Sequence, residues 1–220
     1  MKRFLAVLTM TIVLFTSSIA FAAYEENIME GADLSSVKRV AVAFPNYYKT
    51  EENEPALDEL IREIYEAGKA VSTREVISYD SIASNIRRDT GIDIYQLDVN
   101  EAEKVFKDNI AKYADSYIVT TVANNSERPQ IFYYIYNAAD YNLLYAYSIQ
   151  GRFIGKNTKD YRKASETFYK HFDNTTAKGL SKADKKQFED KRKELKNTRR
   201  QLEDFTYRTD SPRVNKVKKK

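Results

Sequence analysis

The stretch Val37-Lys-Arg-Val-Ala-Val-Ala-Phe44 decides the fold of this chain, and Pro45-Asn46 ends it. Its residues are mostly β-branched or apolar, as is typical of a β-strand. After Arg39 the run lacks the polar alternation of a strand with one face in water. A continuous apolar run of this kind is typical of a strand that is covered on both sides. We therefore expect a strand here that is buried on both faces.

A helix and a second strand are predicted directly after it. Apolar residues recur at helical spacing from Pro55 to Gly68. Proline suits the first position of a helix, and glycine is common where a helix stops. The short segment 74–79 then has the composition of a strand.

Two further helices are predicted between that strand and the middle of the chain. Asp80 can cap the first of them, which is expected to end near Gly91. The second is expected to begin at Asn100, because Glu103 three residues later completes a capping-box pattern.

The second half of the chain is strand-rich. Segments 117–123, 130–137 and 143–150 read as strands, and residues 138–142 form a five-residue hairpin loop between the last two. An amphipathic helix follows, with apolar positions from Tyr161 to Phe172.

The predicted order is β-α-β-α-α-β-β-β-α. One mixed sheet with helices mainly on one face satisfies it, which places the chain in the α/β (α+β) class. We expect antiparallel pairing among the last three strands and a right-handed crossover in the first βαβ unit. Beyond residue 178 a charged helix is expected, and from 209 to 220 a disordered tail.

Two short segments resemble known bacterial envelope domains. Lys38-Arg-Val-Ala-Val-Ala-Phe-Pro45 resembles the opening strand of the amino-terminal domain of TolB, of LpoB and of CsgG-like proteins, and Tyr113-Ala-Asp-Ser-Tyr-Ile-Val119 resembles a later strand entry. The likeness covers residues 37–173. It implies an adaptor or assembly role in the cell envelope and carries over no catalytic residue.

The N-terminus has the three parts of a secretory signal peptide. Lys2 and Arg3 precede an uncharged apolar run, and Ala20-Phe21-Ala22 is a cleavage signal. We expect processing after Ala22 and a periplasmic or secreted product without a transmembrane segment; the alternative is an uncleaved membrane anchor. The remaining domains are then an extension over 23–36, the α/β domain over 37–177 and a basic tail over 178–220.

The chain has no cysteine. A disulfide framework, thiol catalysis and cysteine-ligated metals are therefore excluded. The lipid-modified cysteine typical of LpoB-like and CsgG-like lipoproteins is also missing, so we expect a protein that is not a lipoprotein.

Charge divides the sequence in two. Residues 23–177 carry 18 Lys+Arg against 25 Asp+Glu, a net charge of −7, and residues 178–220 carry 16 against 7, a net charge of +9. Sixteen of the 17 tyrosines lie in the acidic part. The mature chain is thus expected to be an acidic, tyrosine-rich body with a basic tail.

The chemistry-bearing residues form no catalytic, cofactor or metal signature. His171 is the only histidine, which excludes a histidine-pair metal site, and an edge-of-core position is expected. The segment 151–156 has one residue too few between its glycines for a phosphate loop. The acids of the 89–103 segment lack calcium-loop spacing and are expected to cap helices or face solvent: Asp89, Asp93, Asp98, Glu101 and Glu103.

Two groups of residues are candidates for binding a partner. Tyr134 and Tyr136 alternate with apolar residues, so both are expected on the outer face of the sheet, where a partner strand, a peptide or a sugar ring could lie. Cross-strand aromatic packing without a ligand is the alternative. The second group is basic and belongs to the tail: Lys185, Lys186, Arg192, Arg199 and Arg200. A solvated helix without a ligand is the alternative for the tail.

These observations predict a non-enzymatic protein of the cell envelope that acts as an adaptor or accessory binding module. Its expected partners are an envelope protein, through the sheet, and an anionic polymer or phospholipid surface, through the tail. Export argues against a nucleic acid as partner. The alternative is a secreted hydrolase that uses carboxylates of the acidic loops, because the spatial separation of two acids cannot be read from sequence.

Overall fold

The structure is a computed structural model that describes residues 23–47, 49, 52, 54–123, 130–151 and 157–178. In the tail it describes residues 186, 189, 190, 193, 194 and 197, which are helical and, where side chains are described, exposed. The predicted signal peptide, segment 152–156 and the rest of the tail lie outside the described residues.

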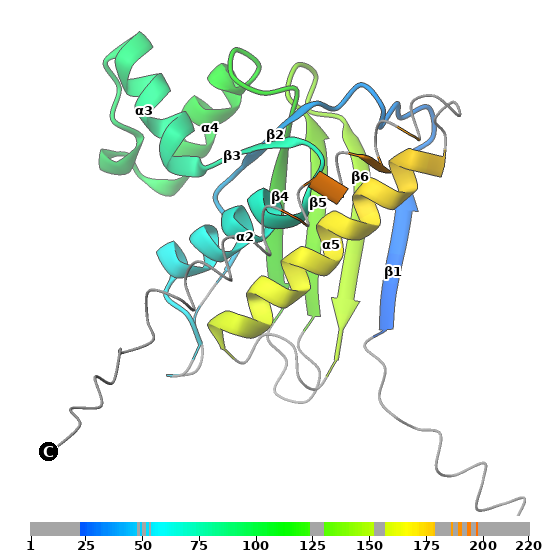
Figure 1. Cartoon of the computed structure of the whole chain (residues 1–220). Helices are drawn as coiled ribbons and strands as arrows, with labels where there is room; N and C mark the ends of the chain where they lie inside the picture. Colours follow the sequence, from blue (N-terminus) through cyan, green and yellow to red (C-terminus); the bar gives the residue numbers. More distant parts are fainter. Residues whose placement is uncertain are drawn as a thin grey trace, which may run out of the picture.

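One mixed six-stranded sheet forms the centre of the molecule, with the strand order β1-β6-β5-β4-β2-β3 (Figure 1). β2 pairs in parallel with β3 and β4, and all other neighbours are antiparallel. The predicted α/β (α+β) class is confirmed, and the predicted element order matches the structure from β2 onward. The strands are β1 (Ala23–Ile28), β2 (Arg39–Val42), β3 (Glu75–Ile77), β4 (Ser116–Ala123), β5 (Gln130–Asn137) and β6 (Leu143–Gln150).

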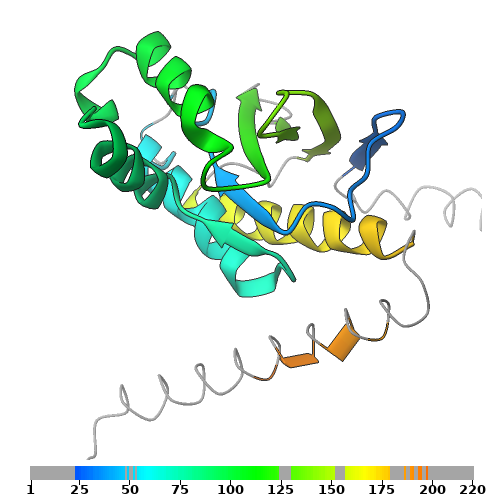
Figure 2. The same cartoon turned by 90° about the horizontal axis from the view of Figure 1, so that it is seen from above.

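Helices cover the two faces of this sheet unequally. α2 (Leu57–Val71) and α5 (Thr158–Lys178) pack side by side on one face, which we call the inner face (Figure 1). On the outer face, α3 (Tyr79–Thr90), the 3₁₀ turn η1 (Ile94–Gln96) and α4 (Val99–Ile110) pack around β2, β3, the start of β4 and the end of β5. Figure 2 shows α5 running along one side of the sheet, with α3 and α4 grouped at one end.

β2 is buried on both faces, as its apolar run predicted. Val40 and Val42 belong to the inner core with α2 and α5, whereas Ala41 and Ala43 pack with α3 and α4. All four side chains are at most 6% exposed.

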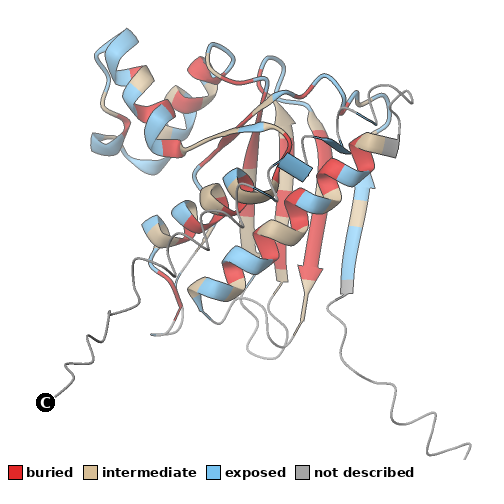
Figure 3. Cartoon of the chain, in the orientation of Figure 1, coloured by how far each residue is buried: buried red, intermediate tan, exposed pale blue. Residues whose placement is uncertain are grey.

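The inner core is built largely from aromatic rings. Tyr133 of β5 stacks on Phe168 of α5 with ring centroids 4.4 Å apart, and its hydroxyl lies 3.0 Å from Ser165 Oγ. Tyr145 of β6 packs against Phe172 of α5 at 5.1 Å. Figure 3 shows buried residues along α5 and the central strands, and the more exposed β1 and α3 at the periphery. The buried tyrosines of the inner core therefore have a packing role.

A buried ion pair joins the residue just before β3 to α5 on the inner face of the sheet. Arg74, just before β3, pairs with Asp173 of α5, and their side chains are 5% and 0% exposed. Asp173 Oδ2 also accepts a hydrogen bond of 2.7 Å from the Thr73 backbone N–H. The guanidinium donates to Val37 O at 3.2 Å and lies 4.2 Å from the centroid of the Phe172 ring. Removing one partner of such a pair costs about 3–5 kcal/mol, because a buried charge is left uncompensated.

The N-terminal extension contributes β1, a strand that its polar sequence did not indicate. β1 pairs with β6 in a register that runs from Ala23↔Gln150 to Ile28↔Tyr145. Its side chains also reach α5: Tyr24 packs 4.5 Å from the ring of His171, and Glu26 accepts a hydrogen bond from Thr175. His171 lies at the edge of the core, where its sequence context predicted it.

Three predicted helix boundaries are wrong in detail. α2 begins at Leu57, two residues after Pro55, and α3 is capped by Ser78 and not by Asp80. α4 begins at Val99, since the Asp98 carboxylate accepts from two backbone N–H groups and fills the role predicted for Asn100. Short polar side chains cap from several nearby positions, so only the contacts decide among them.

Gly68 does not stop α2, which continues to Val71. It marks the closest approach of α2 to α5 instead. A Cβ at this position would lie 2.4 Å from Tyr169 Cζ of α5. The glycine is therefore required by helix packing. Gly91, with φ of 75°, ends α3 in the left-handed conformation, at the position where the helix was predicted to end.

We expect Gly68→Ala to destabilise the protein by about 1–3 kcal/mol, the usual cost of overpacking. Helix propensity alone would stabilise it by about 1 kcal/mol, so the two effects have opposite signs. Urea denaturation measures the difference. In a Tyr169→Leu background, which removes the ring, Gly68→Ala should become neutral or stabilising. Equal effects in both backgrounds would show that the ring is not the cause.

Candidate functional site

The outer face of β5 carries a line of half-buried aromatic side chains. Strand alternation directs Tyr133 and Ile135 into the inner core and leaves Phe132, Tyr134 and Tyr136 on the outer face. We call these three residues the aromatic row.

The neighbouring strands leave the aromatic row partly open. Tyr134 lies between Val119 of β4 and Ala146 of β6, and Phe132 faces Ser148. Ser148 and Ala146 are small, so they cover little of the Phe132 and Tyr134 rings, whereas Tyr136 faces Leu143. The placement of Tyr134 and Tyr136 follows the predicted alternation; their role in binding stays a prediction.

The rings form a continuous chain that leads into a pocket. The Phe132 and Tyr134 rings are stacked with their centroids 6.0 Å apart, and the centroids of the Tyr134 and Tyr136 rings are 6.5 Å apart. Tyr136 stacks on Tyr117 of β4 at 5.4 Å, and Tyr117 meets Phe106 of α4 edge-on at 5.9 Å. Tyr117 thus belongs both to this chain of rings and to the wall of the pocket.

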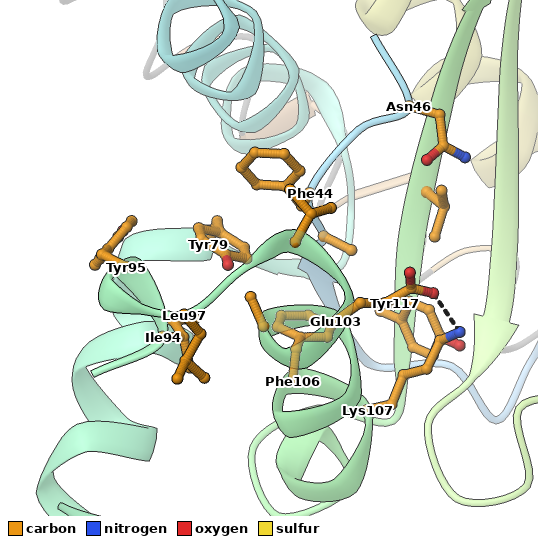
Figure 4. A pocket seen from close by; sticks show the side chains of 14 residues that line it. Phe44, Asn46, Tyr79, Ile94, Tyr95, Leu97, Glu103, Phe106, Lys107 and Tyr117 are labelled. Atoms are coloured by element: carbon orange, nitrogen blue, oxygen red, sulfur yellow. Dashed lines mark hydrogen bonds and ion pairs between the residues drawn. The ribbon is translucent and has the colours of Figure 1, made fainter. Parts of the chain in front are cut away.

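The pocket lies where β2 and β4 meet the η1–α4 segment (Figure 4), and its volume is about 220 Å³. Rings from four separate segments line it: Phe44, Tyr79, Tyr95, Phe106 and Tyr117. Aliphatic side chains of η1 and α4 complete the wall: Ile94, Leu97, Val99 and Ala102. No sequence signal marked this site, because its residues come from segments that only the fold brings together.

The polar groups of the pocket are paired within the protein. Glu103 Oε1 and Lys107 Nζ form an ion pair of 2.5 Å at one side. The Tyr95 hydroxyl donates a 2.5 Å hydrogen bond to Asp80. Burial, strengthened by the Asp80 carboxylate, raises the pKa of Tyr95, and burial raises the pKa of Tyr79 and of Tyr117 to about 12. These phenols stay neutral at ordinary pH, and the pocket is essentially apolar.

The acids of the 89–103 segment have structural contacts. Asp98 caps α4, Asp93 caps η1 and pairs with Arg87 at 3.3 Å, and Asp89 accepts a 2.7 Å hydrogen bond from the Tyr113 hydroxyl. Within the described ranges, no three acidic or histidine side chains come together as metal ligands would. Asp93 and Asp98 therefore cap helices, which is one of the two roles expected for the acids of this segment.

The predicted basic site of the tail is only partly visible. Lys186 is helical and exposed. The other four residues of this group lie outside the described residues: Lys185, Arg192, Arg199 and Arg200. In the part of the chain that the structure describes, no helix is long and apolar enough to cross a membrane.

Comparison by sequence finds no matching family model and no matching curated protein. Comparison by structure finds distant similarities. A PelC dodecamer from Paraburkholderia phytofirmans has a TM-score of 0.35 and 6% identity over 67% of this chain and 91% of that chain. The LpoB C-terminal domain from Salmonella enterica has a TM-score of 0.35 and 12% identity over 56% of this chain and 96% of that one.

TolB from Acinetobacter baumannii is also similar, with a TM-score of 0.31 and 10% identity over 67% of this chain and 29% of that one. LpoB and TolB are two of the families that the sequence resembles. At these TM-scores the likeness is distant, and it carries no conclusion about function.

We expect the aromatic row to contribute little to folding. Tyr134→Thr should cost about 1 kcal/mol, as is common for a partly exposed side chain. Tyr133→Thr, at the adjacent position on the inner face, should cost about 3–5 kcal/mol, because it leaves a cavity against Phe168. Thermal denaturation of the two variants checks this. Equal losses would show that Tyr134 is a core residue.

Proposed function

We propose that this protein is an exported, non-enzymatic binding module of the bacterial cell envelope, located in the periplasm or secreted. Its binding surface is the outer face of the sheet, formed by the aromatic row and the adjoining pocket. The observation that carries the proposal is the half-buried row of Phe132, Tyr134 and Tyr136 beside a pocket of aromatic rings. Aromatic side chains of this kind are enriched where proteins bind one another.

The arrangement of the acids favours binding over hydrolysis. A glycosidase needs two carboxyl groups that face one substrate across about 5–9.5 Å. Here Asp98 and Asp93 are held by backbone N–H groups and Glu103 by Lys107. The pocket itself is lined mainly by apolar side chains. The outer face therefore suits binding of a partner protein better than acid–base catalysis on a substrate.

Site-specific crosslinking in intact cells tests the sheet face. A photoreactive amino acid in place of Tyr134 should give discrete protein adducts. The same residue in place of Lys163, exposed on α5, is the matched control and should not. Adding Tyr136→Ala should lower the adduct yield at position 134. Adducts of equal yield at both sites, or none at position 134, would contradict binding through the outer face.

The basic tail is proposed as a second contact, with anionic envelope polymer or phospholipid. Its net charge of +9 opposes the −7 of residues 23–177, so the tail is attracted to an anionic surface that repels the body. Each basic residue near such a surface adds about 1 kcal/mol, screened over roughly 8–10 Å at moderate salt. The carrying observation is this division of charge.

Sedimentation with anionic phospholipid vesicles tests the tail. The mature protein should bind at low salt and dissociate at high salt. A variant that ends at Lys178, and so keeps α5 intact, should not bind. Binding that survives high salt, or that persists without the tail, would place the contact on another part of the protein.

A further inference from the structure

We infer that the pocket between β4 and the η1–α4 segment binds one ring-sized apolar side chain of a partner polypeptide, at a position flanked by basic residues. This inference rests on the proposed binding function and adds to it the chemistry of the residue that is recognised. Four observations carry it: the size of the pocket, the exposure of its lining, the charge around it and its continuity with the aromatic row.

The size of the pocket selects a single side chain. Pockets that enclose a whole ligand or cofactor usually hold roughly 300–1,000 Å³. An apolar cavity of about 150 Å³ is enough for a benzene ring. With a volume of about 220 Å³, this pocket fits one aromatic ring or one branched aliphatic group. A nucleotide or a larger cofactor would not fit.

The lining is largely apolar, with a buried part that includes Tyr79, Phe106 and Tyr117 and an exposed part. Of the seven large apolar side chains that the described residues expose, three line the pocket: Phe44 at 39%, Tyr95 at 57% and Val99 at 67%. Contact with a partner side chain would remove them from water together. Burial of one aromatic ring in such a site is the usual basis of a binding hot spot.

The charge around the pocket favours basic neighbours of the anchoring residue. Residues 89–103, which form one wall, contain five acids and no lysine or arginine, but Arg87 and Arg88, just before them, pair with Asp93 and Asp89. Among the described residues, Asp98 and Glu101 of this wall have no basic partner, and the Asp80 carboxylate lies beside Tyr95. Of the lining residues only Lys107 is cationic, and Glu103 neutralises it. Glu101, on the first turn of α4, is exposed. A partner with lysine or arginine beside its anchor would therefore be attracted, and an acidic one repelled.

The pocket continues into the aromatic row. Tyr117 lines the pocket, and its ring stacks on Tyr136, the nearest member of the row. A polypeptide whose anchor lies in the pocket can therefore extend over Tyr136 and Tyr134. This continuity favours a polypeptide over an isolated small molecule.

Peptide titration of the mature protein, followed by isothermal calorimetry and by amide NMR shifts, tests the inference. The probes are the acetylated and amidated peptides Lys-Lys-Phe-Lys-Lys, Lys-Lys-Ala-Lys-Lys and Glu-Glu-Phe-Glu-Glu. The basic phenylalanine peptide should bind at least about tenfold more tightly than the alanine peptide, because the alanine peptide lacks the ring. It should also bind at least about tenfold more tightly than the glutamate peptide, because that peptide has the opposite charge. Binding of the basic phenylalanine peptide should weaken as salt is raised.

Two variants with one control locate the site. Ala102→Phe fills the pocket and should reduce binding at least about tenfold, whereas Ala111→Phe, exposed beyond the end of α4, should leave it unchanged. Tyr95→Ala removes an exposed ring from the pocket lining and should weaken peptide binding several-fold. This second variant tests the site even if Ala102→Phe does not fold.

Each outcome decides the inference. Unchanged binding in Ala102→Phe and Tyr95→Ala would overturn the pocket as the site. Equal binding of the acidic peptide would overturn the basic partner, and equally tight binding of N-acetylphenylalaninamide would overturn a polypeptide in favour of a small molecule. The crosslinking and peptide experiments distinguish failure of the proposed function from failure of this inference. If position 134 gives no adducts but the peptide binds the pocket, the proposed binding through the outer face is wrong. If position 134 gives adducts but the peptide does not bind, only the inference about the pocket is wrong.

Discussion

The architecture depends on the buried contact between Arg74 and Asp173. These residues are almost 100 positions apart in the sequence, yet their side chains meet where the start of β3, the loop before β2 and α5 converge. A pair so completely removed from water is favourable only if the remaining hydrogen-bonding groups are also satisfied. The Thr73 N–H, which donates to Asp173, and the Val37 carbonyl and Thr176 hydroxyl oxygens, which accept from Arg74, meet that requirement. The pair therefore holds α5 against the sheet, and the side chains of α5 pack with those of the strands to form the inner core.

Because one face is filled so completely, the opposite face of the same strands is left for another use. β5 shows this at adjacent residues: Tyr133 is fully buried against α5, and Tyr134 lies half-buried on the outer face. The same residue type thus has a packing role on one side and is available to a partner on the other. Helices α3 and α4 cover only one end of the outer face, and the pocket lies at their border with the strands.

The sequence was sufficient where local patterns determine structure. The apolar run of β2, the loop over 138–142 and the alternation of β5 depend on neighbouring residues, and the structure agrees with them. It was insufficient where distant contacts decide. β1 is a polar segment stabilised by β6 and α5, Gly68 is explained only by the Tyr169 ring, and the pocket draws on four separate segments. Cap positions also need geometry, because several polar residues near each helix start are suitable.

The pairing of β1 with β6 has a consequence for the order of folding. Synthesis delivers β1 before every other strand, but its partner, from Leu143 to Gln150, is the last strand of the sheet. Closing so long a loop carries an entropic cost that local hairpins such as β5–β6 avoid. We therefore expect the strand that is made first to pair last, after β6 has paired with β5. Until β1 pairs, β6 would present an unpaired edge, and unpaired strand edges favour aggregation.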